Sequence, residues 1–230
     1  MSAPTAPGGC APGPARREDI AELSFAVTGC RALEHAAVPT LSFRLSLTRT
    51  GGGPVRSVAL TTDVRIAPAR RRPADGERLA LARLFGRPEQ WATSMRPLSW
   101  ARLTTFVPPF DARTVLELPV PCTRECELAV TAYFEAVRDG EVPLEFHFSG
   151  TVFHTGDDGR LRTSQISWNG EAVHRLPARQ WHELTSRYFG GQSWLRVSRE
   201  THDLLAAHRD RRALAGWDET VRDLVEGSAG

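Results

Sequence analysis

The sequence predicts a mainly β protein: an antiparallel two-layer β-sandwich, immunoglobulin-like or related, with a short helical insert and C-terminal helices. Several short segments alternate apolar with polar residues, which is the period of a strand buried on one face only. Clusters of glycine, proline and aspartate, typical of turns, separate these segments. Of the 230 residues, 41% are hydrophobic, so the chain can bury a core of ordinary size.

The N-terminal part begins with a tail and then contains the clearest strands. Residues 1–17 are rich in proline, glycine and alanine, and we expect them to be disordered. Strands are expected from about residue 22, and over residues 41–48 Leu and Phe alternate with Ser, Arg and Thr. The alternation returns over residues 58–66, after the turn sequence Thr50-Gly-Gly-Gly-Pro54. We therefore predict that 41–48 and 58–66 form a long hairpin.

A short helical insert is expected near residues 75–95. Asp75 can cap a helix whose apolar residues, from Leu79 to Phe85, end at Gly86. A second helical turn follows, opened by a proline at a tolerated first position. The insert interrupts a β-sandwich domain that we expect over residues 18–175.

Strand patterns resume after the insert. We expect strands over residues 98–107, 114–120, 126–137, 144–155 and 161–168. The segment 126–137 is also rich in Glu, Leu and Ala, which favour helices, but its strict apolar alternation favours a strand. Asp139-Gly140 and Asp157-Asp158-Gly159 are predicted to be hairpin turns.

Beyond the strand segments the sequence indicates helices. The first predicted helix presents Trp181, Leu184 and Tyr188 on one face. Two further helical segments follow, and Ser198 is placed to cap the first of them. We expect residues 176–226 to form a C-terminal helical extension packed on the sandwich.

All 29 basic residues are arginine, and the sequence contains no lysine. Schiff-base chemistry on lysine and a P-loop lysine are therefore excluded. The net charge is +2, because the arginines oppose 27 acidic residues. This balance argues against a general nucleic-acid binder. The absence of lysine most simply reflects a GC-rich genome.

The sequence predicts a cytoplasmic protein that does not insert into a membrane. No apolar run approaches the roughly 20 residues that span a bilayer, and the N-terminal residues lack the hydrophobic segment of a signal peptide. The four cysteines, Cys10, Cys30, Cys122 and Cys126, do not suggest a disulfide scaffold in a chain of this length.

Cys122 and Cys126 are candidate metal ligands or redox residues. In an extended segment four residues span roughly 13 Å, which is too far for a disulfide or for one metal ion. Prolines just before the pair oppose a helix, so structural thiols are the preferred interpretation. His147 and His154 are seven residues apart on one predicted strand and should face opposite sides. We therefore expect no metal ion and no cofactor, and no motif predicts a catalytic residue.

Arg65, Arg70, Arg71 and Arg72 are the candidate partner-binding residues. The simpler interpretation is a solvated strand end. The sharper hypothesis is that these arginines bind carboxylates of a protein partner. The six tryptophans support it, because Arg and Trp anchor interfaces, although most of them are expected in the core.

Seven segments carry a resemblance to a known family: Leu41-Ser-Phe-Arg-Leu, Val64-Arg-Ile-Ala-Pro-Ala-Arg-Arg-Arg, Leu84-Phe-Gly, Pro121-Cys-Thr-Arg-Glu-Cys-Glu, Pro143-Leu-Glu-Phe-His-Phe-Ser-Gly-Thr-Val-Phe, Arg175-Leu-Pro and Ser193-Trp-Leu-Arg. In their order and spacing they resemble an uncharacterised bacterial protein family from GC-rich genomes, whose members tend to be encoded beside nickel–iron hydrogenase genes. The resemblance covers roughly residues 22–225, and Cys122 fits its pattern whereas the position of Cys126 varies. It implies an accessory role in assembly or maturation of a hydrogenase, with a hydrogenase subunit or maturation factor as partner.

Three functions stay open at this point. The first is a non-enzymatic accessory protein that binds a protein partner. The second is an enzyme or metallochaperone whose site is assembled across the sandwich. The third is a sandwich that binds a small ligand or a carbohydrate.

Overall fold

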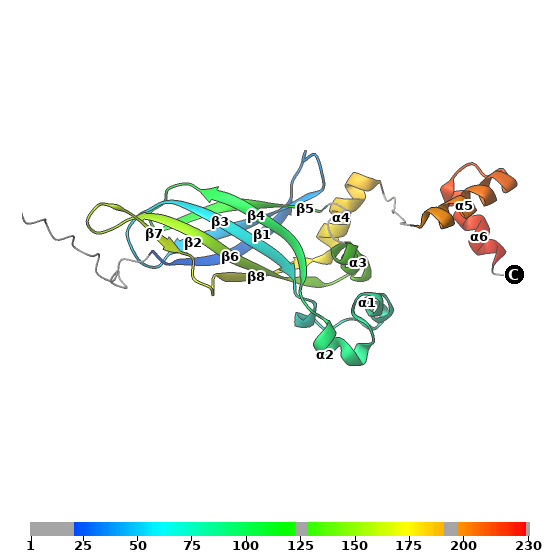
Figure 1. Ribbon diagram of the computed structural model, residues 1–230, viewed down its shortest axis with the longest axis horizontal. Helices are drawn as coiled ribbons and strands as arrows, with labels where there is room; N and C mark the ends of the chain where they lie inside the picture. The colour runs from blue at the N-terminus through cyan, green and yellow to red at the C-terminus, as the bar shows by residue number, and fades with distance from the viewer. Residues whose placement is uncertain (1–20, 123–127, 191–196, 229–230) are drawn as a thin grey trace, which may run out of the picture. The chain divides into compact units, whose positions relative to one another are not determined.

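The computed structural model describes residues 21–122, 128–190 and 197–228, and its strands form two antiparallel sheets (Figure 1). One sheet has the order β1-β2-β5. The other has the order β4-β3-β6-β7, and β8 also pairs with β6. The predicted class, a mainly β antiparallel sandwich with added helices, is confirmed. The strands are β1 (Leu23–Ala32), β2 (Thr40–Arg49), β3 (Val55–Ile66), β4 (Leu98–Val107), β5 (Arg113–Pro121), β6 (Glu141–Thr155), β7 (Leu161–Gln165) and β8 (Glu171–Pro177).

The core lies between the two sheets. Alternate residues of β2, including Leu41, Phe43 and Leu45, are fully buried. Phe43 packs edge-on against two rings of the other sheet, with ring centroids 5.1 Å from Phe146 and 6.2 Å from Trp100. The period-two pattern thus correctly predicts which face of β2 is apolar.

The predicted hairpin between 41–48 and 58–66 is wrong, because β2 and β3 belong to different sheets. β2 pairs with β1 and β5, whereas β3 pairs with β4 and β6, so both edges of each strand are occupied. The glycine-rich segment between them crosses from one sheet to the other. It passes so close to the strand end of β6 that a Cβ at Gly53 would collide with the Thr155 carbonyl oxygen.

The predicted strand over 126–137 is also wrong, because this segment contains helix α3 (Leu128–Ala136). Its buried residues are Val130, Tyr133, Phe134 and Val137, which follow the i, i+3, i+4, i+7 spacing of a helix face. Asp139-Gly140 therefore joins a helix to β6 and is not a hairpin turn.

The second predicted turn is confirmed, and one strand was missed. β6 and β7 pair antiparallel around Asp157-Asp158-Gly159, where Gly159 has a φ of 75°. β7 ends at Gln165, and the strand that sequence reasoning missed is β8.

The helices that directly follow β3, β5 and β8 lie near one end of the sandwich (Figure 1). The insert near residues 75–95 is confirmed. α3 links the other helices: the Phe85 and Tyr133 ring centroids are 6.3 Å apart, and Phe134 stacks on Trp181 at 4.8 Å. The helical elements of this region are η2 (Pro68–Arg70), η3 (Asp75–Glu77), α1 (Arg78–Phe85), η4 (Pro88–Gln90), α2 (Trp91–Ser94), α3 and α4 (Ala178–Phe189).

The chain divides into two compact units between Gly190 and Gly191. α4 lies with the strands, whereas the sequence prediction began the helical extension at residue 176. The second unit contains α5 (Arg199–Arg212) and α6 (Trp217–Gly227). Ser198 caps α5 as expected, and its hydroxyl accepts a hydrogen bond from the Thr201 amide at 3.1 Å. That this extension packs on the sandwich stays a prediction.

Among the described helices, none is both long and apolar enough to cross a membrane.

Candidate functional site

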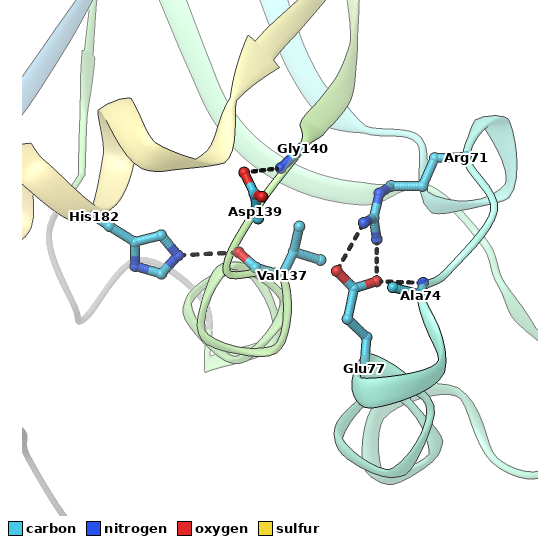
Figure 2. A network of polar contacts seen from close by, with 7 residues as sticks. All are labelled: Arg71, Ala74, Glu77, Val137, Asp139, Gly140 and His182. Atoms are coloured by element: carbon cyan, nitrogen blue, oxygen red, sulfur yellow. Dashed lines mark hydrogen bonds and ion pairs between the residues drawn. The ribbon is translucent and has the colours of Figure 1, made fainter.

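Arg71 of the predicted cluster is engaged within the protein (Figure 2). Its guanidinium donates two hydrogen bonds to Glu77, Nη1 to Oε2 at 2.6 Å and Nη2 to Oε1 at 2.8 Å. The two side chains are only 12% and 11% exposed. Glu77 Oε2 also accepts a hydrogen bond from the Ala74 amide at 2.9 Å. The hydrogen bond to Glu77 raises the pKa of Arg71. Arg71 and Glu77 therefore hold together the two ends of the loop that precedes α1.

The other three arginines of the cluster are exposed. Arg70 pairs with Glu145 of β6 at 2.6 Å (Nε to Oε1). Arg65 lies opposite the same Glu145 in the β3–β6 register. Arg72 is exposed beside the half-buried Arg71. Arg71 is therefore structural, and the exposed Arg70 pairs with Glu145 of the same chain. The other two exposed arginines, Arg65 and Arg72, remain candidates for partner binding.

The cysteine and histidine candidates are dispersed. Cys122 is 2% exposed, and its thiol lies 3.6 Å from the Val120 carbonyl oxygen. Cys126 lies outside the described residues. His154 is buried whereas His147 is half-buried, in line with their expected opposite faces on β6. Within residues 21–122, 128–190 and 197–228, no group of three or more His, Cys, Asp or Glu side chains is arranged to hold a metal ion.

The structure contains a pocket of about 160 Å³ that the sequence did not predict. It lies on the polar face of the sheet β1-β2-β5, and all three strands contribute side chains. Its lining residues are Thr28, Gly29, Cys30, Arg31, Ser42, Arg44 and Glu117.

The strand register brings these residues together. Arg44 of β2 lies between Gly29 of β1 and Glu117 of β5, and Arg31 lies opposite Ser42. The β1–β2 register shifts between Val27 and Gly29, as at a β-bulge. A Cβ built on Gly29 would meet no atom within 4 Å, so this position leaves the pocket open.

Glu117 is the centre of the pocket. The Ser42 hydroxyl donates to its Oε2 at 2.5 Å. Arg44 Nε lies 3.5 Å from Oε1, and Arg31 Nε lies 3.8 Å from Oε2. These partners, the Ser42 hydroxyl above all, hold the pKa of Glu117 below its ordinary value. The pocket therefore holds one ionised carboxylate between two guanidinium groups.

Cys30 at the pocket edge is a poor nucleophile. Burial, and secondarily the charge of Glu117, raise the pKa of its thiol to about 12. The thiol stays protonated near neutral pH, and a protonated thiol does not attack electrophiles. The chemistry that this pocket offers is binding.

The second unit exposes an apolar helix face. Trp217, Val221, Leu224 and Val225 of α6 follow the i, i+4, i+7, i+8 spacing of one helix face, and each is between 39% and 62% exposed. Among the described residues of this unit only Thr220 is buried.

Polar contacts join α5 to α6 beside this face. Asp223 accepts hydrogen bonds from Arg212 Nη2 at 2.7 Å and pairs with His208 Nε2 at 2.8 Å. The Arg209 guanidinium lies 4.7 Å from the centroid of a Trp217 ring. Charged contacts therefore join the two helices, and within the described residues of this unit α5 covers the α6 apolar face only in part, through Arg209 and His202 beside Trp217.

Comparison with known proteins gives a family and little else. No curated protein matches the chain. Among solved structures, a CARDB domain from Pyrococcus furiosus, in complex with di-metal ions, is 11% identical, with 68% of this chain and 87% of that one covered and a TM-score of 0.27. An ApaA-type protein from Bordetella pertussis is 13% identical, with 69% and 97% covered and a TM-score of 0.26. β-Glucosidase 3B from Thermotoga neapolitana is 12% identical, with 67% and 17% covered and a TM-score of 0.24.

These structural likenesses are too slight to support an argument about function. The family match is different in extent, because the model of one family covers residues 20–230. The chain therefore belongs to DUF6084, a family of unknown function.

Proposed function

We propose that the protein is a non-enzymatic accessory protein that binds a protein partner through the α6 apolar face. The observation that carries the proposal is the exposed row of Trp217, Val221, Leu224 and Val225. Fully burying one large apolar side chain contributes about 1.5–3 kcal/mol, and the four side chains of this row are 39–62% exposed. The exposed part of the row therefore represents binding energy that the second unit uses only in part. Tryptophan is also the residue type most enriched at the energetic centre of interfaces.

The dimensions of the second unit support the same proposal. α5 has 14 residues and α6 has 11, and isolated helices shorter than about 12–15 residues are marginal in water. Helices of this kind gain most of their stability from packing an apolar face. A partner that covers α6 would supply that packing.

We further propose that the partner is a subunit or maturation factor of a nickel–iron hydrogenase or a similar redox complex. The support is the resemblance to a family encoded beside hydrogenase genes. The absence of a predicted catalytic motif is in keeping with an assembly role.

The test uses the tagged full-length chain produced at native abundance in its own host. We expect hydrogenase subunits to co-purify with it, and the double variant Val221→Asp with Leu224→Asp to reduce their recovery at least about ten-fold, because charges then occupy the α6 apolar face. Leu79→Asp is the matched control, since Leu79 is a 76% exposed helical leucine in the other unit. Equal recovery with both variants would contradict binding through α6. Unchanged hydrogenase assembly and activity after gene deletion would contradict the choice of partner.

A further inference from the structure

We propose that the pocket on the polar face of β1, β2 and β5 binds a carboxylate group between Arg31 and Arg44. This inference goes beyond the proposed function, which depends on α6. It rests on the donors of the two arginines, the net charge of the pocket and its size.

Both arginines have donors to spare. The ion pair of each with Glu117 is through Nε, at 3.5 Å for Arg44 and 3.8 Å for Arg31, and no described residue accepts a hydrogen bond from their terminal nitrogens. Neither makes another ion pair with a residue of the described part of the chain. A guanidinium has five N–H donors in a planar fork that matches a carboxylate with two parallel hydrogen bonds. The terminal N–H groups of Arg31 and Arg44 are therefore available to a second carboxylate.

The charge of the pocket favours a monoanion. Arg31 and Arg44 contribute two positive charges, and Glu117, ionised at neutral pH, contributes one negative charge. One bound carboxylate neutralises the remaining positive charge. A phosphate dianion would leave an excess negative charge beside Glu117, and like charges at close range repel.

The pocket is also of a size for one small group. Its volume of about 160 Å³ is well above the roughly 10–15 Å³ that one water molecule needs. The open space over Gly29 gives a ligand access from solvent. The end of an aspartate or glutamate side chain, or a short carboxylic acid, fits these dimensions.

The carboxylate has two possible sources, an acidic side chain of a protein or a free small acid. Two probes separate them: sodium acetate, and the capped peptide acetyl-Gly-Gly-Glu-Gly-Gly-amide. The peptide with Gln in place of Glu is the matched probe without charge. Tighter binding of the Glu peptide than of acetate, by about ten-fold or more, assigns the site to a protein side chain. Equal or weaker binding of the peptide assigns it to a free acid.

The experiment follows the arginine Nε–H signals of the full-length chain by NMR during titration with each probe. We expect saturable shifts of the Arg31 and Arg44 signals, with a Kd in about the millimolar range for an exposed site, and no shift with the Gln peptide. Arg44→Ala should weaken binding at least about ten-fold. Arg83→Ala, which removes an exposed arginine from α1, is the control and should leave binding unchanged.

Glu117→Gln gives the sharpest result. It removes the competing carboxylate and leaves an acceptor for Ser42, so we expect carboxylate binding to become about three- to ten-fold tighter. A variant that merely disturbed the sheet would weaken binding instead. The proposal is overturned if Glu117→Gln weakens binding while the amide spectrum stays native, if Arg44→Ala leaves the Kd unchanged, or if inorganic phosphate binds more tightly than acetate.

Discussion

Two glutamates of this protein lie beside arginine, Glu77 before α1 and Glu117 in the pocket on the sheet β1-β2-β5. The ion pairs in these two regions differ in burial and in geometry. Glu77 and Arg71 form a two-point pair with both side chains nearly buried. Glu117 lies between Arg31 and Arg44, whose side chains are 59% and 60% exposed and approach it at 3.5–3.8 Å. A buried two-point pair consumes the arginine fork, whereas a long exposed contact leaves it available.

The difference separates structural arginines from arginines that can bind a ligand. Removing one partner of a buried pair leaves an uncompensated charge inside the protein, where water does not solvate it, and the loss of stability is large. Removing one partner of an exposed pair returns the other to water, and the cost is small. Stability measurements should therefore distinguish the two regions even though each contains the same residue types.

The largest expected effect is at Arg71. Arg71→Ala leaves the Glu77 carboxylate buried without its partner, so we expect the free energy of unfolding to fall by about 3 kcal/mol. Urea denaturation of the full-length chain measures it, and the exposed neighbour variant Arg72→Ala should change it by less than about 0.5 kcal/mol. The double variant Arg71→Met with Glu77→Leu should recover at least about half of the loss, because it removes both charges together. A loss below about 1 kcal/mol in Arg71→Ala would remove the distinction between the regions.

Ser42→Ala should have an intermediate effect. The Ser42 hydroxyl is the main cause of the lowered pKa of Glu117, so the variant should raise that pKa toward its ordinary value. A hydrogen bond to a charged group contributes about 1.5 kcal/mol or more when it is buried. Because Glu117 is exposed to solvent, which screens this contact, we expect a smaller loss of about 0.5–1 kcal/mol at pH 7.

The pH dependence of Ser42→Ala has a definite sign. A carboxylate whose pKa is lowered on folding contributes stability above its unfolded pKa of about 4.3, and this stability is lost as the pH falls through the folded value. The difference between wild type and variant should therefore shrink on acidification. Thermal unfolding at pH 7 and pH 3, with a carbon-13 titration of the Glu117 carboxyl, measures both quantities. A difference that grows toward pH 3 would contradict this account.

The sequence predicts local features of this fold more reliably than pairings between distant segments. The alternation in β2 correctly indicates its buried face, because the pleat alone sets that period. The same alternation carries no information about the strand's neighbours, and the predicted pairing with β3 was wrong for this reason. In α3 the sequence fits either period, and burial of Tyr133 and Phe134 against neighbouring helices decides for the helix.

The candidate site shows the same limit. Arg70, Arg71 and Arg72 attract notice because they are adjacent in sequence, yet Arg71 is structural. Arg44 and Glu117 are 73 residues apart, and only the β2–β5 register brings them together. No local pattern marks either residue, so the pocket could be found only from the sheet.

The smallest expected effect on stability is at Arg44. Arg44→Ala should lower the free energy of unfolding by less than about 0.5 kcal/mol, because its contact with Glu117 is long, exposed and screened by salt. Urea denaturation at 0.1 M and 1 M NaCl measures it, and the small difference should vanish at the higher salt. Carboxylate binding in the same variant should nevertheless fall at least about ten-fold, so that binding and stability separate at one residue. A loss above about 1.5 kcal/mol, with an unchanged denaturant slope, would show that Arg44 is structural in the same sense as Arg71, and only Arg31 would then remain free to bind a ligand in the pocket.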